Sequence, residues 1–327
     1  MAVSKPDAIH RGAKPMAFVF LLLVKTVWKT FLQFTMKIFI LRFIILCVSI
    51  CNMNILVKSQ QNNAKRIKAS ESANWLLSHG ISFITTDDLA ALLGVPKNHV
   101  PQRMAALKQR GEIVSPAQGL WMPVPPEFMT WGAPPAIDVI DALMRHLNVN
   151  YYIGWLSAAE LLGAAHHAPQ VFQVATSRVI RARTAGRSRF QFYRREHISQ
   201  VSLIQTETKS GMVPVSSRET TLLDIANDIG IVGGIDNAAN LVIELCEVSE
   251  PDIEVTAALA VHYPVTAARR LGYLMENFTE FSGLATLKKA CARRNTTSSL
   301  LDPQSEPGGT INTEWNIKVN REVSPDV

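Results

Sequence analysis

The spacing of apolar residues between positions 85 and 124 predicts two helices followed by two strands. Leu89 and Leu93 recur at helical spacing in the first helix. Thr85 is a favoured N-cap residue, and Gly94 provides the left-handed conformation in which helices commonly end. The first helix is therefore expected to lie between these two residues.

A second helix is expected directly after a short turn, with Asn98 as its N-cap and Pro101 in its first turn. Val100, Met104 and Leu107 give this helix one apolar stripe. The other faces carry mostly hydrogen-bond donors and almost no acid: His99, Gln102, Arg103, Lys108, Gln109 and Arg110. The pattern predicts a helix that packs on one side and presents basic and amide groups on the other.

Glu112–Val114 and Leu120–Met122 are predicted strands, joined by a turn at Ser115–Gly119. A helix, a tight turn, a basic helix and a hairpin, in this order, are typical of a winged helix-turn-helix. Such a helix fits the major groove, where side chains read base edges and phosphates. The predicted DNA contacts here are Lys97, Asn98, His99, Gln102, Arg103, Lys108 and Arg110. An ordinary helical hairpin with a strand pair, or a winged helix that binds only protein, remains an alternative.

The rest of the chain predicts a larger mixed domain. Further helices are expected over residues 64–77, 136–147, 157–165, 218–229, 237–247, 255–261 and 267–276, and strands near 81–84, 171–174 and 201–204. The fold class predicted is α+β: an N-terminal winged helix-turn-helix domain over residues 53–126, then a mixed α/β C-terminal domain over 127–295. Residues 296–327 are rich in Ser, Thr, Pro and Gly and are expected to be a disordered tail.

Two stretches of the second domain have opposite charge. An arginine run interleaves with the aromatic segment Gln191–Tyr193, a pattern found on surfaces that bind nucleic acid. Its members are predicted DNA contacts: Arg178, Arg181, Arg183, Arg187, Arg189, Arg194 and Arg195. A solvated strand edge is the alternative. Residues 219–268 hold nine acids and no Lys or Arg, which predicts a dimer contact, repulsion from DNA or plain solvation.

The net charge of +6 says nothing about DNA, because residues 1–52 hold seven Lys or Arg and one acid, which is the whole excess. Their apolar run, interrupted by lysines, suits a membrane anchor, an interfacial segment, or upstream sequence translated from a wrong start. We expect a cytoplasmic protein that starts near Met53; an inner-membrane tether through residues 16–51 is the alternative. The four cysteines indicate neither a disulfide framework nor a metal site.

Enzyme motifs are weak. Glu207 and Lys209 after a predicted strand are similar to half of a restriction-type nuclease core, but no suitable second acid precedes them. His166 and His167 have no Cys or acid at ligand-like spacing nearby. We therefore predict no catalytic residue, cofactor or metal. A metal-dependent nuclease or DNA-processing enzyme centred on Glu207 and Lys209 is kept as the alternative.

The order of segments resembles the AbiEi antitoxins of type IV toxin–antitoxin, or abortive-infection, systems. The motifs are Tyr152–Gly163, Val171–Thr176, the arginine-rich strand pair and Val215–Ile225, within roughly residues 65–294. The resemblance implies a repressor that pairs, as a homodimer on DNA, on inverted repeats of double-stranded DNA in its own promoter. It also implies a second domain that counteracts a nucleotidyltransferase-like toxin without necessarily forming a stable complex. A membrane-tethered transcription factor is a further alternative.

Overall fold

The structure is a computed structural model, which describes residues 66–164, 170–292 and 297–326. The chain separates into two units, residues 1–66 and 67–327. The interpretations of residues 1–52, and the pair His166 and His167, lie outside the described residues. Within the described ranges, no helix is both long enough and apolar enough to cross a membrane.

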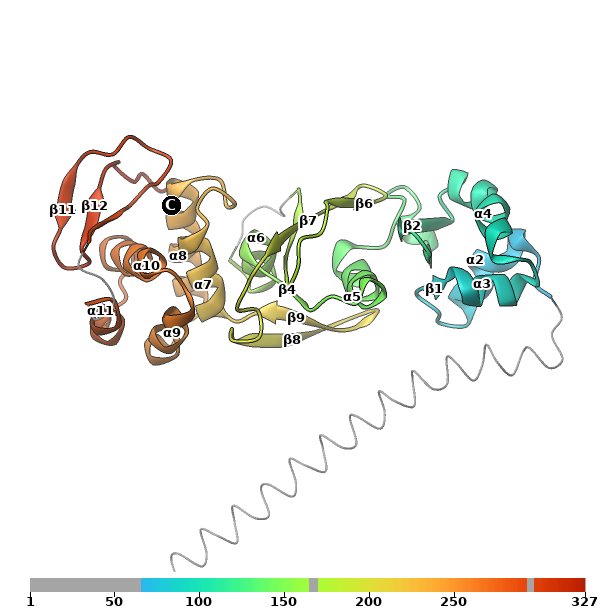
Figure 1. Cartoon of the computed structure of the whole chain (residues 1–327), viewed down its shortest axis with the longest axis horizontal. Coiled ribbons are helices and arrows are strands. Elements are labelled where there is room, and N and C mark those ends of the chain that lie inside the picture. Colours follow the sequence, from blue (N-terminus) through green and yellow to red (C-terminus); the bar gives the residue numbers. More distant parts are fainter. Residues whose placement is uncertain (1–65, 165–169, 293–296, 327) are drawn as a thin grey trace, which may run out of the picture. The chain divides into compact units, whose positions relative to one another are not determined.

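The first described elements are short helices on a small sheet (Figure 1). They are η1 (Ala69–Glu71), α2 (Ser72–Ser78), β1 (Ile84–Thr85), α3 (Thr86–Leu93), η2 (Lys97–His99), α4 (Val100–Gln109), β2 (Ile113–Ala117) and β3 (Leu120–Pro123). The sheet order is β1-β3-β2, antiparallel, with Ile84 opposite Trp121. Leu76 and Leu89 pack with the buried stripe of α4 into one core.

The predicted start of α3 is confirmed, because the Thr85 side chain accepts a hydrogen bond from the Asp88 backbone N–H at 3.2 Å. Gly94 ends the helix with φ of 65°. The prediction of Asn98 as the N-cap of α4 was wrong. Asn98 lies inside the 3₁₀ turn η2, and α4 begins at Val100 without a side-chain cap. A single 3₁₀ turn replaces the cap because it lets backbone groups satisfy one another.

A six-stranded mixed sheet follows, in the order β6-β7-β5-β4-β9-β8. Its elements are α5 (Ala136–Leu147), β4 (Tyr151–Ile153), α6 (Trp155–Leu161), β5 (Phe172–Thr176), β6 (Arg183–Ala185), β7 (Ser188–Arg194), β8 (Leu203–Thr208) and β9 (Gly211–Ser216). Side chains alternate between its faces. Ile153 packs into a core with Leu143 of α5, whereas Tyr152 packs into a second core with Leu222.

The helix predicted over residues 157–165 starts earlier than expected, so Ser157 is not its N-cap. The helix begins at Trp155, after Gly154, and the Ser157 hydroxyl instead accepts a hydrogen bond from the Gln173 N–H at 2.9 Å. This bond fixes α6 to β5. The second core is completed by α7 (Arg218–Asn227), α8 (Ile235–Val248), α9 (Ile253–Leu259), η4 (Ala260–His262), α10 (Val265–Phe278) and α11 (Ala285–Ala292).

The prediction of a disordered tail was wrong for residues 297–326. They form a three-stranded sheet, β10-β12-β11, from β10 (Ser299–Leu300), β11 (Thr310–Asn312) and β12 (Ile317–Val319). Trp315 is buried against Gly272, where an added Cβ would lie 2.1 Å from the indole ring. The Arg270 guanidinium donates to the Leu301 carbonyl at 2.6 Å and to the Leu300 carbonyl at 3.1 Å. A few specific contacts therefore order a segment that has no hydrophobic periodicity.

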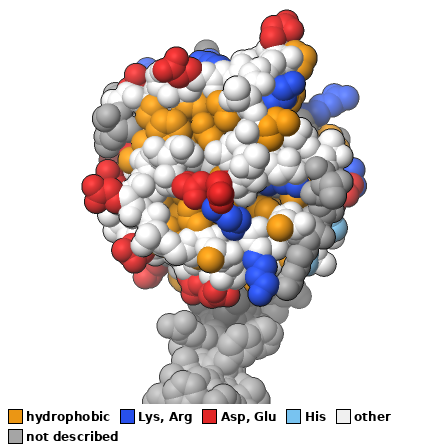
Figure 2. All heavy atoms as spheres, turned by 90° about the vertical axis from the view of Figure 1, so that its left-hand side faces the viewer, with side chains coloured by type: hydrophobic (Ala, Val, Ile, Leu, Met, Phe, Trp, Pro, Cys, Tyr) orange, Lys and Arg blue, Asp and Glu red, His pale blue; other side chains and the backbone are white. Residues whose placement is uncertain are grey.

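Figure 2 looks onto this end of the molecule, where hydrophobic side chains gather in two areas with acidic and basic side chains between them. An ion-pair group of the same region ties α11 to α10 and to the tail. The Lys288 ammonium lies 3.2 Å from a Glu276 carboxylate oxygen and 2.6 Å from one of Glu314. It also lies 5.2 Å from the centroid of the Trp315 ring. These contacts lie over the buried indole and hold the tail sheet in place.

Candidate nucleic-acid interface

The outer face of α4 is the most basic described surface that the first core positions. Val100 and Met104 are fully buried and Leu107 nearly so, which fixes the rotation of the helix about its axis. The predicted contact residues lie on the remaining faces, and all are exposed: Lys97, Asn98, His99, Gln102, Arg103, Lys108 and Arg110. The structure therefore brings these seven predicted residues together on η2, α4 and its C-cap.

These side chains differ in whether they already form ion pairs or hydrogen bonds within the protein. Lys97 lies 2.7 Å from Asp87, and Arg110 lies 2.5 Å from Glu112. The hydrogen bond that Arg110 donates to Glu112 raises the pKa of Arg110 above its ordinary value. Gln102, Arg103 and Lys108 have no side-chain hydrogen bond or ion pair with any described residue. These three side chains are therefore free to contact a ligand without breaking an internal bond.

The β2–β3 hairpin faces the second part of the chain. A ring nitrogen of His146 lies 2.9 Å from the Gln118 carbonyl oxygen, at the hairpin turn. The Arg183 guanidinium donates to the Pro116 carbonyl at 3.4 Å. The hairpin is therefore engaged with the second part of the chain, whereas the outer face of α4 is exposed.

The arginine run does not form one surface. Five of its members are exposed: Arg178, Arg181, Arg187, Arg189 and Arg194. Arg178 donates to the Leu147 carbonyl at 2.5 Å, and Arg187 lies 5.9 Å from the centre of the Trp131 ring. Arg194 pairs with Glu196 at 3.2 Å. Arg181 and Arg189 have no ion pair within the described ranges, so they are the run's freest cations.

Arg195 differs from the exposed arginines of the run, and its surroundings were not predicted from the sequence. Its side chain is 19% exposed, and its guanidinium donates to Asp224 at 2.7 Å and also to Asp228. Its guanidinium carbon Cζ lies 5.0 Å from the centre of the Trp155 ring and 5.7 Å from that of Tyr263. Two carboxylates and two aromatic rings already surround the charge of Arg195, so this arginine, unlike the exposed members of the run, is engaged within the protein.

The acids in this cluster are bound from several elements. Asp224, on α7, is fully buried and accepts hydrogen bonds from the hydroxyls of Tyr152 and Tyr263, both at 2.9 Å. Asp228 accepts from the Trp155 indole N–H at 3.0 Å. Burial raises the pKa of Asp224 to about 6, although Arg195 and the tyrosine hydroxyls oppose the change. The cluster joins β4, α6 and α7 to the residues that directly follow β7 and η4 through one buried ion-pair network.

This network was missed from the sequence, although part of its signal was visible. Asp224 stands in an otherwise apolar helix segment, between Leu223 and Ile225, and burial of an acid there requires a partner. Asp224 and Asp228 are two of the nine acids in residues 219–268, for which the sequence predicted a dimer contact, repulsion from DNA or plain solvation. For these two the assignment was wrong, because they neutralise Arg195. Which arginine pairs with these two acids depends on tertiary contacts, and spacing along the chain cannot show those contacts.

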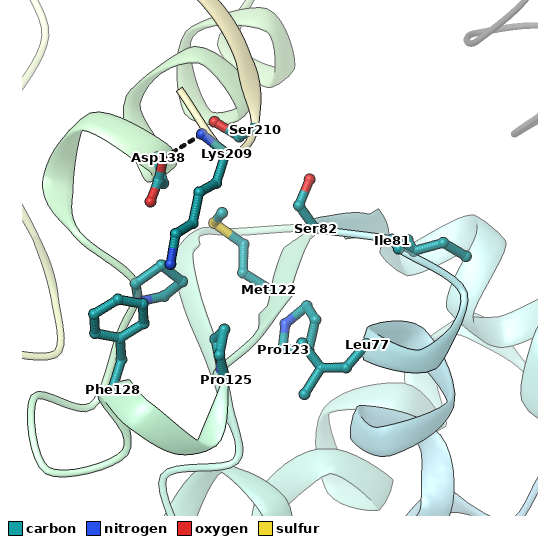
Figure 3. Close-up of a pocket in the computed structure, with 12 residues that line it drawn as sticks. Leu77, Ile81, Ser82, Met122, Pro123, Pro125, Phe128, Asp138, Lys209 and Ser210 are labelled. Carbon is teal, nitrogen blue, oxygen red and sulfur yellow. Dashed lines mark hydrogen bonds between the residues drawn. The ribbon is translucent and has the colours of Figure 1, made fainter. Parts of the chain in front are cut away.

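Glu207 and Lys209 do not form a metal site in this structure. The Lys209 side chain extends along a cavity of about 170 Å³ toward Phe128, with its ammonium 5.1 Å from the ring centre (Figure 3). Its backbone N–H donates to Asp138 at 3.1 Å. Burial raises the pKa of Asp138. Glu207 is exposed, and no group of three or more His, Cys, Asp or Glu residues within the described residues could hold a metal ion.

The α+β class predicted from the sequence is confirmed by these elements. Residues 152–277, which contain the Arg195–Asp224–Asp228 network, match the family model of the AbiEi antitoxin C-terminal domain. The resemblance to AbiEi-type antitoxins is therefore confirmed over these residues.

Comparison with solved structures agrees at the level of the fold. The crystal structure of the RV2827C protein from Mycobacterium tuberculosis aligns with a TM-score of 0.58 at 17% identity, covering 76% of this chain and 90% of that one. An antigenic nucleotidyltransferase-like protein from Paracoccidioides brasiliensis aligns with a TM-score of 0.26 at 11% identity, covering 38% of this chain and 89% of that one. That score is too low to show a shared fold. No curated protein matches the sequence.

Proposed function

We propose that this protein is a DNA-binding transcriptional autorepressor and an antitoxin that counteracts a nucleotidyltransferase-like toxin. The observation that carries the DNA-binding part is the outer face of α4, where Gln102, Arg103 and Lys108 are exposed and have no hydrogen-bond or ion-pair partner among the described residues. The AbiEi antitoxin C-terminal domain over residues 152–277 supports the antitoxin part. The two activities are assigned to different parts of the chain.

The proposal interprets the elements from α2 to β3 as a winged helix-turn-helix. In that motif the second helix lies in the major groove, with its N-terminal residues nearest the base edges. Gln102 and Arg103 lie in the first turn of α4. Their amide and guanidinium groups suit adenine and guanine respectively, while Lys108 and Arg110 suit phosphates. Lys97, Asn98 and His99 precede the helix and are assigned to the DNA backbone at its entry.

The exposed arginines of the second domain extend this proposal. Arg181 and Arg189, which lack ion pairs among the described residues, are assigned to the DNA backbone, and Arg178, Arg183, Arg187 and Arg194 to weaker contacts. The proposed ligand is an inverted-repeat operator in the protein's own promoter, occupied by two copies. The proposed boundaries are residues 53–126 for the DNA-binding domain and 127–295 for the antitoxin domain, to which the ordered residues 297–326 add the tail sheet.

Binding of the purified protein to its own promoter fragment tests the DNA-binding part. The variant Gln102→Ala/Arg103→Ala removes two side chains that can each discriminate bases by about 1–3 kcal/mol, so preference for the promoter over unrelated DNA should fall by roughly 30-fold or more. Gln109→Ala, an exposed residue at the other end of α4, is the matched control and should bind like the wild type. Equal promoter preference in the wild type and the double variant would contradict the assignment of α4.

A further inference from the structure

The two edges of the six-stranded sheet differ in how well they are protected against pairing with a strand of another molecule. The β6 edge is three residues long and includes Arg183. The β8 edge has six residues, no proline and a single charged residue, Glu207, and its pairing with β9 runs without a register shift. Leu203 and Ile204 on β8 are 36% and 41% exposed. Natural sheets blunt exposed edges with charge, proline or bulges, and β8, at the margin of the sheet in Figure 1, has little of this protection.

The register shows which backbone groups of β8 point away from the sheet. Thr208 pairs with Gly211 across a two-residue turn, and the Ser217 N–H donates to the Ser202 carbonyl at 2.9 Å. Hydrogen-bonded pairs alternate along an antiparallel ladder, so the even-numbered residues of β8 bond to β9. The N–H and C=O groups of Leu203, Gln205 and Glu207 therefore point outward. Pro214, opposite Gln205, agrees with this parity because it has no N–H to donate.

We propose that β8 pairs antiparallel with β8 of a second copy of this chain, with a two-fold axis at Gln205. In this register Gln205 lies opposite Gln205 of the second copy, and Leu203 lies opposite Glu207. All the outward groups then find partners, in three residue pairs that exchange about six N–H···O bonds. The pairing extends two six-stranded sheets into one continuous sheet.

Other registers are less suitable. An axis at Glu207 would place two carboxylates directly opposite each other. An axis at Thr206 would require Leu203 to pair with Lys209, whose N–H already donates to Asp138 at 3.1 Å. Of these three axes, the one at Gln205 alone uses every outward group of β8 without opposing like charges or breaking an existing bond.

The side chains also favour a copy of the same strand. With the axis at Gln205, Ile204 lies opposite Thr206, and such β-branched pairs stabilise neighbouring strands. Leu203 meets the aliphatic part of Glu207, so both exposed aliphatic residues of β8 are covered. A single strand pair buries less surface than the roughly 1,200–2,000 Å² of a stable interface, so we expect weak association that strengthens when two copies bind one DNA molecule.

Disulfide trapping in the full chain tests the register. Cys47, Cys51 and Cys246 are replaced by Ser and buried Cys291 by Ala, and melting of this background confirms that it folds. Gln205→Cys should then form a covalent dimer under oxidation, because Cα atoms of a hydrogen-bonded pair lie about 5.5 Å apart. Thr208→Cys is the matched control. Its two copies would lie six residues apart along the ladder, about 20 Å, and should not cross-link.

Sedimentation tests the interaction without cross-linking. Gln205→Pro removes an outward N–H and spares the β8–β9 hydrogen bonds, so the dissociation constant should rise by at least about tenfold, whereas Gln205→Ala should stay near the wild type. A wild type that is monomeric up to about 100 μM with no cross-link at Gln205→Cys would overturn the proposal. Equal cross-linking at Thr208→Cys, dimers insensitive to Gln205→Pro, or β8 occupied by a strand of another protein instead of a second copy would overturn it as well.

Discussion

Replacing Arg195 by Leu tests whether this arginine stabilises the fold, in contrast to the arginines proposed to bind DNA. The variant leaves the buried carboxylate of Asp224 and the nearby carboxylate of Asp228 without their shared cation, and it removes the contacts with Trp155 and Tyr263. Loss of one partner of a buried ion pair costs about 3–5 kcal/mol. For a cooperative unit of this size, the midpoint of thermal unfolding should fall by roughly 6–20 °C.

The loss should depend on pH. Burial raises the pKa of Asp224 to about 6, above its unfolded value of 3.8, so this carboxyl contributes its full stability below about pH 4 and loses it as pH rises through about 6. Without Arg195 the opposing charge is gone and the pKa of Asp224 rises further. The stability deficit of Arg195→Leu should therefore be smallest near pH 5 and largest near pH 8.

Urea denaturation at both pH values, run beside DNA binding at several salt concentrations, provides the assay. Arg189→Leu is the matched control, since Arg189 is exposed and lies on β7, the strand that Arg195 directly follows. It should unfold like the wild type but reduce the salt dependence of DNA binding by about 0.9 log unit if one phosphate contact is lost. If Arg195→Leu keeps wild-type stability and loses binding to all DNA sequences, the network described here is refuted.

Three further predictions follow from individual contacts. Gly272→Ala should destabilise the protein by about 1–3 kcal/mol, because the added Cβ would lie 2.1 Å from Trp315, and in a Trp315→Ala background the same change should cost much less, as a double-mutant cycle in urea would show. Thr85→Ala should cost about 1 kcal/mol through loss of the α3 cap, which thermal melting can measure against exposed Thr184→Ala. Replacing Arg187, Arg189 and Arg194 together by Gln should weaken binding to all DNA sequences without changing promoter preference, and unchanged affinity and salt slope would instead support the solvated-edge alternative.

Periodicity predicted the elements whose stability comes from an amphipathic pattern. α5 has the bounds that were expected, residues 136–147, and Val100, Met104 and Leu107 are buried as their spacing indicated. The Thr85 cap and the Gly94 helix end also follow from local chemistry, because their partners lie within four residues. Local rules succeed where the partner of a residue is near it in the chain.

Apart from the Asn98 cap, the failures involve partners that are distant in the sequence. Arg195 is linked to Asp224 across 29 residues, and Arg270 binds carbonyls of the tail some 30 residues away. Ser157 has the right composition and spacing for an N-cap, but its hydroxyl binds the backbone of Gln173 on β5 instead. A sequence pattern records which residues are polar, and only the fold decides which of them meet.

The most direct test of the proposed function is whether repression and antitoxin action can be separated. The Gln102→Ala/Arg103→Ala variant is expressed from an unrelated promoter in cells that carry the induced toxin and a reporter fused to the native promoter. We expect an active reporter, because α4 no longer recognises the operator. We also expect normal growth, because residues 152–277, which match the model of the AbiEi antitoxin C-terminal domain, are unchanged. A variant that folds normally but still represses the reporter, or that no longer restores growth, would contradict the proposed function.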